Sequence, residues 1–205
     1  MNLRFFTILC LTGAALSAAE PYFPTKTEKG VSAFEAEWYG KALSRMGEPS
    51  LLRSASDAKS YIFRFTILPT WGNPISIRVT KEAGIYRLAA RRLGGQGGYD
   101  PGKLTEKKDI KLSDADSKLF EEQLSRVHFC EMSTQDETQG MDGEQWILEG
   151  VADGKYHVVV RWCASDYDPK KRKLVQFLAL CSFLSDKSGL SRKPLNKGHE
   201  LLPTR

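Results

Sequence analysis

The sequence is poor in the residues from which metal centres are built. Its 205 residues include 3 histidines and 4 cysteines, and none of these form a His-x-His or Cys-x-x-Cys pair. Zinc sites are usually recognised by such closely spaced ligands. The acidic residues of segment 136–144 also lack the one-three-five spacing of a calcium loop. We therefore expect neither a metal nor another cofactor.

The chain also lacks an apolar run long enough to cross a membrane, which takes roughly twenty residues. Its leading apolar run, residues 5–16, follows Arg4 and precedes the small residues Ser17, Ala18 and Ala19. A positive residue, an apolar run of about a dozen residues and a small-residue site make up a cleaved signal peptide. We predict that residues 1–19 are such a peptide. The protein is then exported, either periplasmic or secreted.

No charge of one sign dominates, since 30 Lys and Arg stand against 25 Asp and Glu. Proteins that bind nucleic acid concentrate basic residues with aromatic ones, so we expect no nucleic-acid partner. The densest basic cluster is Lys170, Lys171, Arg172 and Lys173, at the start of a predicted helix. We interpret it as a solvated helix end. The alternative is a docking site for an anionic surface.

A glycine-rich segment has the spacing of a phosphate-binding loop, with four residues between Gly97 and the pair Gly102-Lys103. The next residue is Leu104, where such loops need Ser or Thr to hold magnesium. The segment also leads into a charged strand and not into a helix whose N-terminus would face the phosphates. We therefore expect no nucleotide, and interpret the segment as a flexible connection.

Three cysteines remain after removal of the predicted signal peptide. Cys181 lies in an apolar helical run and is expected to be buried. Cys130 and Cys163 each follow a regular element, where a bridge is sterically easier. They form a candidate disulfide, and two free thiols are the alternative, because spacing alone does not fix the geometry.

Hydrophobic periodicity predicts helices and strands in an order that favours an α+β fold. Ser32 and Glu35 have the spacing of a capping box before the first helix, and Ser113 is placed to cap the second. The helices are too few for alternating βαβ units, so we expect a mainly antiparallel sheet of about six strands with two or three helices on one face. Strands are expected at residues 61–67, 75–79, 85–93 and 103–112 and in a hairpin at 145–163, and the third helix at 169–184.

This pattern divides the chain into a signal peptide (1–19), a leader (20–30), a single α+β domain (31–184) and a basic, disordered tail (185–205). Removal of the signal peptide leaves about 186 residues, which is enough for one domain with a substantial core.

The hairpin at residues 145–163 offers the best candidate for a binding surface. Its central pair, Asp153-Gly154, suits a type I′ turn, and this register places Trp146 opposite Arg161. One face is mostly apolar, includes Trp162 and is expected to be the core side. The other face carries Trp146, His157 and Arg161 as a candidate binding patch. The alternative, which we favour, is that a helix covers this second face.

Three stretches of the sequence form a specific combination: WY…EPSL at residues 38–51, GGYDPGKL at 97–104, and DGEQWILEGVADGKYH…RW at 142–162. Together they resemble a family of uncharacterised bacterial exported proteins, over about residues 34–190. The resemblance implies export, and it implies that the glycine-rich segment is a shared structural element. No activity, ligand or site residue follows from it.

Two functions remain open. The first is a non-enzymatic exported module that binds an envelope or extracellular protein or polymer. The nearest candidate for nucleophilic catalysis, His157 with Cys163, fails because six residues on one strand span roughly 20 Å. The second is a small exported hydrolase or a carbohydrate- or peptide-processing enzyme with a site assembled from distant residues. A deep pocket with convergent titratable groups would favour the enzyme, and a flat aromatic patch the binding module.

Overall fold

The computed structural model of the chain describes residues 21–25, 27 and 29–190. The predicted signal peptide and residues 191–205 of the predicted tail lie outside the described residues. The elements, in chain order, are α1 (Ala33–Arg45), α2 (Leu51–Ser54), β1 (Ile62–Pro69), β2 (Ile75–Glu82), β3 (Ile85–Leu93), β4 (Leu104–Lys111), α3 (Asp114–Val127), the 3₁₀ turn η1 (Phe129–Glu131), β5 (Glu144–Ala152), β6 (Lys155–Trp162) and α4 (Val175–Lys187).

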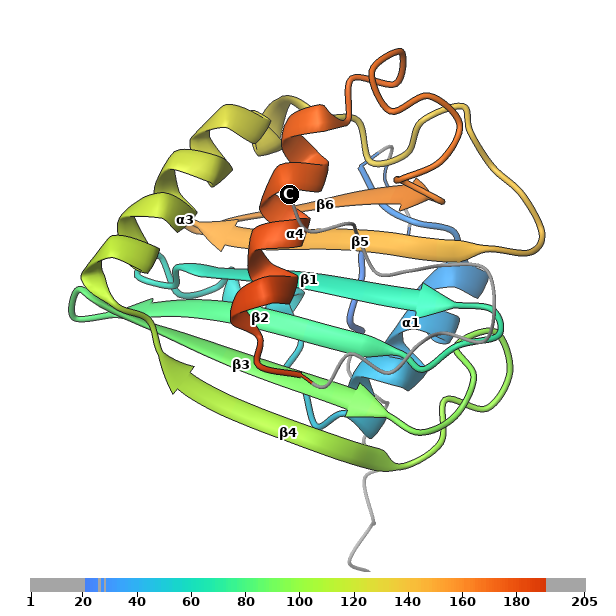
Figure 1. Ribbon diagram of the computed structural model, residues 1–205, viewed down its shortest axis with the longest axis horizontal. Helices are drawn as coiled ribbons and strands as arrows, with labels where there is room; N and C mark the ends of the chain where they lie inside the picture. The colour runs from blue at the N-terminus through green and yellow to red at the C-terminus, as the bar shows by residue number, and fades with distance from the viewer. Residues whose placement is uncertain (1–20, 26, 28, 191–205) are drawn as a thin grey trace, which may run out of the picture.

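The six strands form one antiparallel sheet in the order β4-β3-β2-β1-β5-β6 (Figure 1). Strands β1 to β4 follow one another as a meander, and the β5–β6 hairpin then adds to the free side of β1. Strand β1 is therefore central, with Phe65 opposite both Ile77 of β2 and Leu148 of β5. The predicted α+β fold with a six-stranded antiparallel sheet is confirmed.

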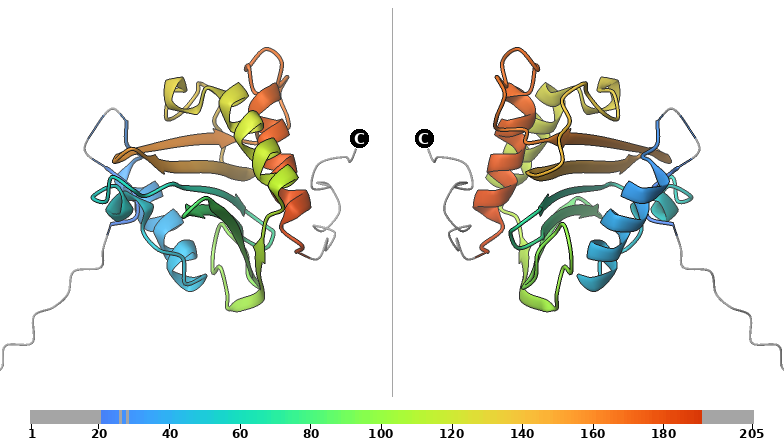
Figure 2. Two further views of the ribbon diagram at one scale, coloured as in Figure 1. Left: turned by 90° about the vertical axis from the view of Figure 1, so that its left-hand side faces the viewer. Right: turned by 90° about the vertical axis from the view of Figure 1, so that its right-hand side faces the viewer.

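Helices cover both faces of the sheet, and the expectation that they would share one face was wrong. Helices α3 and α4 pack on one side and α1 on the other, so the molecule has three layers (Figure 2). The reason lies in the central strands, because β1 is buried at seven of its eight positions and β5 at seven of nine. A strand that is apolar on both faces needs a cover on each side.

The larger core lies between the sheet and helices α3 and α4. It is built on strand residues such as Phe63, Phe65 and Leu148, and on Phe120 of α3 and Phe177 of α4. The smaller core lies between the sheet and α1, where Tyr39 and Leu43 of the helix meet Leu68, Ile147 and Val160 of the strands. The two cores together bury most apolar residues of the four inner strands, whereas Leu104 and Ile110 of the edge strand β4 are exposed.

The leader belongs to the smaller core. Phe23 is 1% exposed and Val31 is 4% exposed. The Phe23 ring meets the Tyr39 ring edge-on, with the ring centres 5.6 Å apart. The backbone amide of Val31 donates to the carbonyl of Pro24 over 2.9 Å, which turns the leader back onto α1. This segment therefore packs as part of the domain.

Local capping signals place two helix starts as expected. Ser32 and Glu35 form both hydrogen bonds of the capping box at α1, and the Ser113 side chain accepts from the amide of Asp116 at α3. Helix α4 differs, because it begins at Val175 and not near Pro169. Cys163, Tyr167, Asp168 and Lys173 have positive φ, and residues 163–174 form a loop between β6 and α4. The helix then continues to Lys187, past the predicted start of the tail.

The predicted hairpin turn and sheet edge are both present. Asp153 and Gly154 have φ values of 51° and 70°, as a type I′ turn requires. Strand β4 is an edge strand whose side chains are mostly exposed, and its charges discourage pairing with another chain. No helix among the described residues has the length and apolar character needed to cross a membrane.

Candidate functional site

The hairpin register is as predicted, with Trp146 opposite Arg161, but the candidate patch is not a surface. Trp146 is 1% exposed and Arg161 4% exposed. Trp146 lies in the larger core, with its ring centre 5.3 Å from that of Phe65. Two of the three patch residues are therefore buried, and His157 is half-buried, so the three side chains do not form an exposed patch.

Each member of this patch has a structural partner. The Arg161 guanidinium donates to the carbonyls of Ser133 and Thr134, over 3.0 and 3.2 Å. The His157 ring places Nε2 3.0 Å from the carbonyl oxygen of Met132. Burial lowers the pKa of His157 and also that of Arg161. These residues fasten the segment after η1 along the edge of β6.

The candidate disulfide is not formed, because Cys130, Cys163 and Cys181 are all free thiols. The ring of Phe129, next to Cys130, contacts His157 on β6. Cys163 directly follows the end of that strand, six residues beyond His157 and roughly 20 Å from it. A disulfide needs Cα atoms within about 7 Å. Burial raises the pKa of the Cys163 thiol.

The basic cluster is divided between the surface and the interior. Lys170, Lys171 and Lys173 are exposed, but the Arg172 side chain is 7% exposed. Its guanidinium donates to the carbonyls of Trp162 and Cys163, over 2.9 and 3.0 Å, and pairs with Asp136 over 2.9 Å. Arg172 therefore joins the loop 163–174 to the loop 132–143. The four residues do not form the predicted exposed cluster.

The glycine-rich segment is a packed element and not a flexible connection. The amide of Gly97 donates to the carbonyl of Gly72, and that of Gly98 to the carbonyl of Thr70. A Cβ on Gly97 would lie 2.6 Å from the carbonyl oxygen of Pro69, so only glycine permits this approach. The Trp38 indole also donates to the carbonyl of Gly97, which fixes the segment to α1. In the described part of the chain, no group of three or more His, Cys, Asp or Glu side chains could hold a metal ion.

A buried ionic cluster that the sequence analysis missed lies under the α1 layer. Arg64 and Glu149 face each other on β1 and β5, both fully buried, with a contact of 2.6 Å. Glu48 lies 3.6 Å from Arg64 and 2.8 Å from Arg78, and the Tyr156 hydroxyl donates to Glu149. Burial alone would lower the pKa of Arg64, but the carboxylates of Glu149 and Glu48 raise it by more, so the net shift of this pKa is upward. The one sequence feature that could have indicated this cluster is Arg64, the single charged residue in the largely apolar strand β1.

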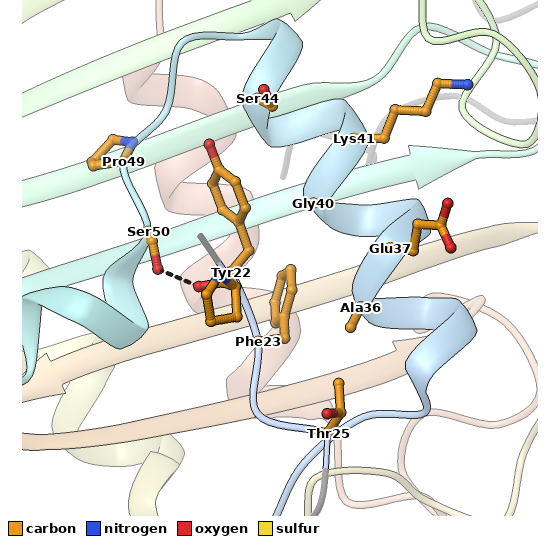
Figure 3. A pocket seen from close by; sticks show the side chains of 11 residues that line it. Tyr22, Phe23, Thr25, Ala36, Glu37, Gly40, Lys41, Ser44, Pro49 and Ser50 are labelled. Carbon is orange, nitrogen blue, oxygen red and sulfur yellow. Dashed lines mark hydrogen bonds between the residues drawn. The ribbon is translucent and has the colours of Figure 1, made fainter. Parts of the chain in front are cut away.

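A groove of about 680 Å³ runs between the leader and α1 (Figure 3). The Tyr22 ring lies against Gly40, where a Cβ would be 3.3 Å from the ring. The Tyr22 hydroxyl donates to the carbonyl of Glu48 over 2.8 Å, and the Ser50 hydroxyl donates to that of Pro21 over 2.8 Å. The hydroxyl groups of Tyr22 and Ser50 hold the leader, so we interpret this groove as the seam along which the leader docks.

A second pocket, of about 530 Å³, lies between the N-terminus of α1, the loop 132–143 and the ends of β5 and β6. We call it the end pocket. Its apolar walls are Phe34, Trp38, Met141, Val160 and Trp162. Its polar walls are Ser32, Glu35, Gln135, Asp136, Thr138, Gln139 and Gln145.

Exposed large apolar side chains gather around the end pocket. Phe34 is 72% exposed and Met141 98% exposed. Trp71 and Tyr99 are more than half exposed, with their ring centres 5.1 Å apart. They follow β1 and β3, Met141 precedes β5, and Tyr167 follows β6. In this antiparallel sheet all four therefore lie at the same end. We call Phe34, Trp71, Tyr99, Met141 and Tyr167 the aromatic end.

Comparison with protein family models, with curated proteins and with solved structures found no match to this chain. Its function is therefore inferred from geometry and chemistry alone.

Proposed function

We propose that this protein is a non-enzymatic exported module that binds an envelope or extracellular partner through the aromatic end. The observation that carries the proposal is the gathering of exposed Phe, Trp, Tyr and Met side chains at one end of the sheet, around a pocket. Large apolar side chains exposed together on a domain mark interaction surfaces, whereas single ones are ordinary. Aromatic and Met side chains are also the types enriched where partners bind.

The backbone of the loop 163–174 supports the same location. Cys163, Tyr167, Asp168 and Lys173 all have positive φ, between 41° and 58°. Non-glycine residues pay for this conformation, and such residues gather at functional sites. Here the loop holds the Tyr167 ring stacked on Trp162, with the ring centres 5.1 Å apart and the planes at 27°.

An enzyme would need free titratable groups that converge on the pocket. Glu35 and Asp136 line it, but both carboxylates are engaged. Glu35 accepts from the amide of Ser32 and from the Gln135 side chain, each over 2.8 Å, and Asp136 is paired with Arg172. This arrangement supports binding over hydrolysis.

The proposal is tested by retention of envelope components on immobilised protein that begins at Glu20. A double variant, Trp71→Ser with Met141→Ser, removes two members of the aromatic end. Ile85→Ser is the matched control, because Ile85 is 38% exposed and starts β3 at the opposite end of the sheet. We expect the double variant to lose the retained partner and the control to keep it. Equal retention by all three proteins would contradict the proposal.

A further inference from the structure

The end pocket offers a ligand almost no net charge. The Glu35 carboxylate accepts from the Ser32 amide, the Tyr39 hydroxyl and the Gln135 side chain, over 2.8, 3.1 and 2.8 Å. The Asp136 carboxylate is paired with Arg172 and lies 3.7 Å from Arg161. Both carboxylates therefore already accept hydrogen bonds or ion pairs within the fold. Glu35 has no ion-pair partner among the described residues, but the two arginines beside Asp136 balance the two carboxylates in sum.

The positive groups near the pocket are engaged in the same way. Arg172 donates to Asp136 and to the carbonyls of Trp162 and Cys163, and Arg161 donates to those of Ser133 and Thr134. An anionic ligand would have to compete with these contacts. The ligand that fits best is therefore neutral.

The polar side chains of the end pocket that are free to hydrogen-bond a ligand are uncharged. Gln139 is exposed and Gln145 is half-buried, both line the pocket, and neither amide has a hydrogen-bond partner within the described residues. A Gln amide both donates and accepts, and so does the hydroxyl of Thr138, which lines the same wall. Such groups match hydroxyls on a ligand.

The apolar wall of the end pocket is made largely of aromatic side chains. The Phe34 and Trp38 rings lie with their centres 6.0 Å apart, and Phe34 is 72% exposed. Trp162 contributes an edge only, since Tyr167 stacks on its ring and Gly140 lies so close that a Cβ would be 2.2 Å from it. Exposed aromatic faces hold flat apolar surfaces of a ligand.

We propose that the end pocket binds a neutral saccharide unit of an envelope or extracellular glycan. A pyranose ring has an apolar C–H face for the Phe34 and Trp38 rings and hydroxyl groups for the Gln139 and Gln145 amides. A pocket of about 530 Å³ lies within the range of small-molecule sites. This inference rests on the proposed binding function and names its ligand class.

The test measures binding of neutral tetrasaccharides of glucose, mannose and N-acetylglucosamine by calorimetry, with uncharged tetrapeptides as the competing class. We expect at least one saccharide to bind, and Gln139→Ala or Phe34→Ala to weaken that binding about tenfold, as loss of one hydrogen bond or ring contact does. Both side chains are exposed, so these variants keep the fold. Ile85→Ser should bind as the unchanged protein does.

Failure of all three saccharides to bind would overturn the inference, as would saccharide binding that neither variant weakens. Peptide binding that Phe34→Ala abolishes, without saccharide binding, would overturn the saccharide inference and leave the proposed binding function standing. The two proposals therefore fail separately.

Discussion

Trp146 and Trp162 lie on neighbouring strands in different surroundings. Trp146 is buried in the larger core, whereas Trp162 is half-buried between Tyr167 and Gly140. We expect Trp146→Ala to lower the free energy of unfolding by roughly 3–5 kcal/mol, as loss of a buried aromatic side chain does. Trp162→Ala should cost less, roughly 1–2 kcal/mol, because it removes less area from contact. Urea denaturation of the two variants measures both values, and a larger loss for Trp162→Ala would contradict this assignment.

From the sequence, the face with Trp162 was expected to be the core side and the face with Trp146 was the candidate surface. The difference arises from contacts with segments outside the hairpin. Alternation along the hairpin correctly separated its two faces, and pairing correctly placed Trp146 opposite Arg161. Whether a face is covered depends on segments outside the hairpin, such as α3 and α4, which form the larger core with Trp146. The same holds for Arg64 and Glu149, which are 85 residues apart and meet only when β5 joins β1. Such contacts have no local pattern.

At the scale of elements, helices α3 and α4 are joined where one begins and the other ends. Asp116 in the first turn of α3 contacts Lys187, the last residue of α4, over 2.7 Å. Each charge also suits the dipole of its own helix end. Hydrogen bonds from Lys187 and Ser113 hold the pKa of Asp116 below its ordinary value.

This ion pair gives a pH dependence of defined sign. The folded pKa of Asp116 lies below the unfolded value of about 3.9, so the pair stabilises the protein above that pH. The stabilisation is lost as pH falls through the lowered pKa. We expect Lys187→Met to raise the pKa of Asp116 and to reduce stability at neutral pH, with the difference vanishing in strong acid.

NMR titration of the Asp116 carboxyl and denaturation at neutral and strongly acidic pH check both parts. Lys118→Met, at an exposed position of α3, is the control and should leave the titration unchanged. A stability difference that grows towards acid would refute the sign.

Elements that depend on local chemistry were predictable. The capping residues Ser32 and Ser113 and the turn Asp153-Gly154 all act within four residues of themselves, and all three were placed correctly. The start of α4 was not, because Arg172 turns inward to Asp136 and to carbonyls of the β6 end. A local helix signal was overridden there by contacts from a distant loop.

At the scale of the whole molecule, the leader completes the smaller core. Phe23→Ala should lower the free energy of unfolding by roughly 3–5 kcal/mol, because the ring is 1% exposed and packs on Tyr39. The measurement is a denaturant melt of protein that begins at Glu20. Thr25→Ala, an exposed leader position, should change stability little. A negligible effect of Phe23→Ala would show that the leader contributes nothing to the domain.

Arg172 also bears on how fast a ligand is captured. Through Asp136 and the carbonyls of Trp162 and Cys163, its guanidinium joins the loop 132–143, which lines the end pocket, to the end of β6 and the loop 163–174. Ordering loops on binding costs free energy and slows association when a rearrangement must come first. Because these loops are already fixed to each other, ligand binding costs little conformational entropy. Association should then follow simple second-order kinetics, with the rate rising in proportion to ligand concentration and no plateau from a preceding conformational step.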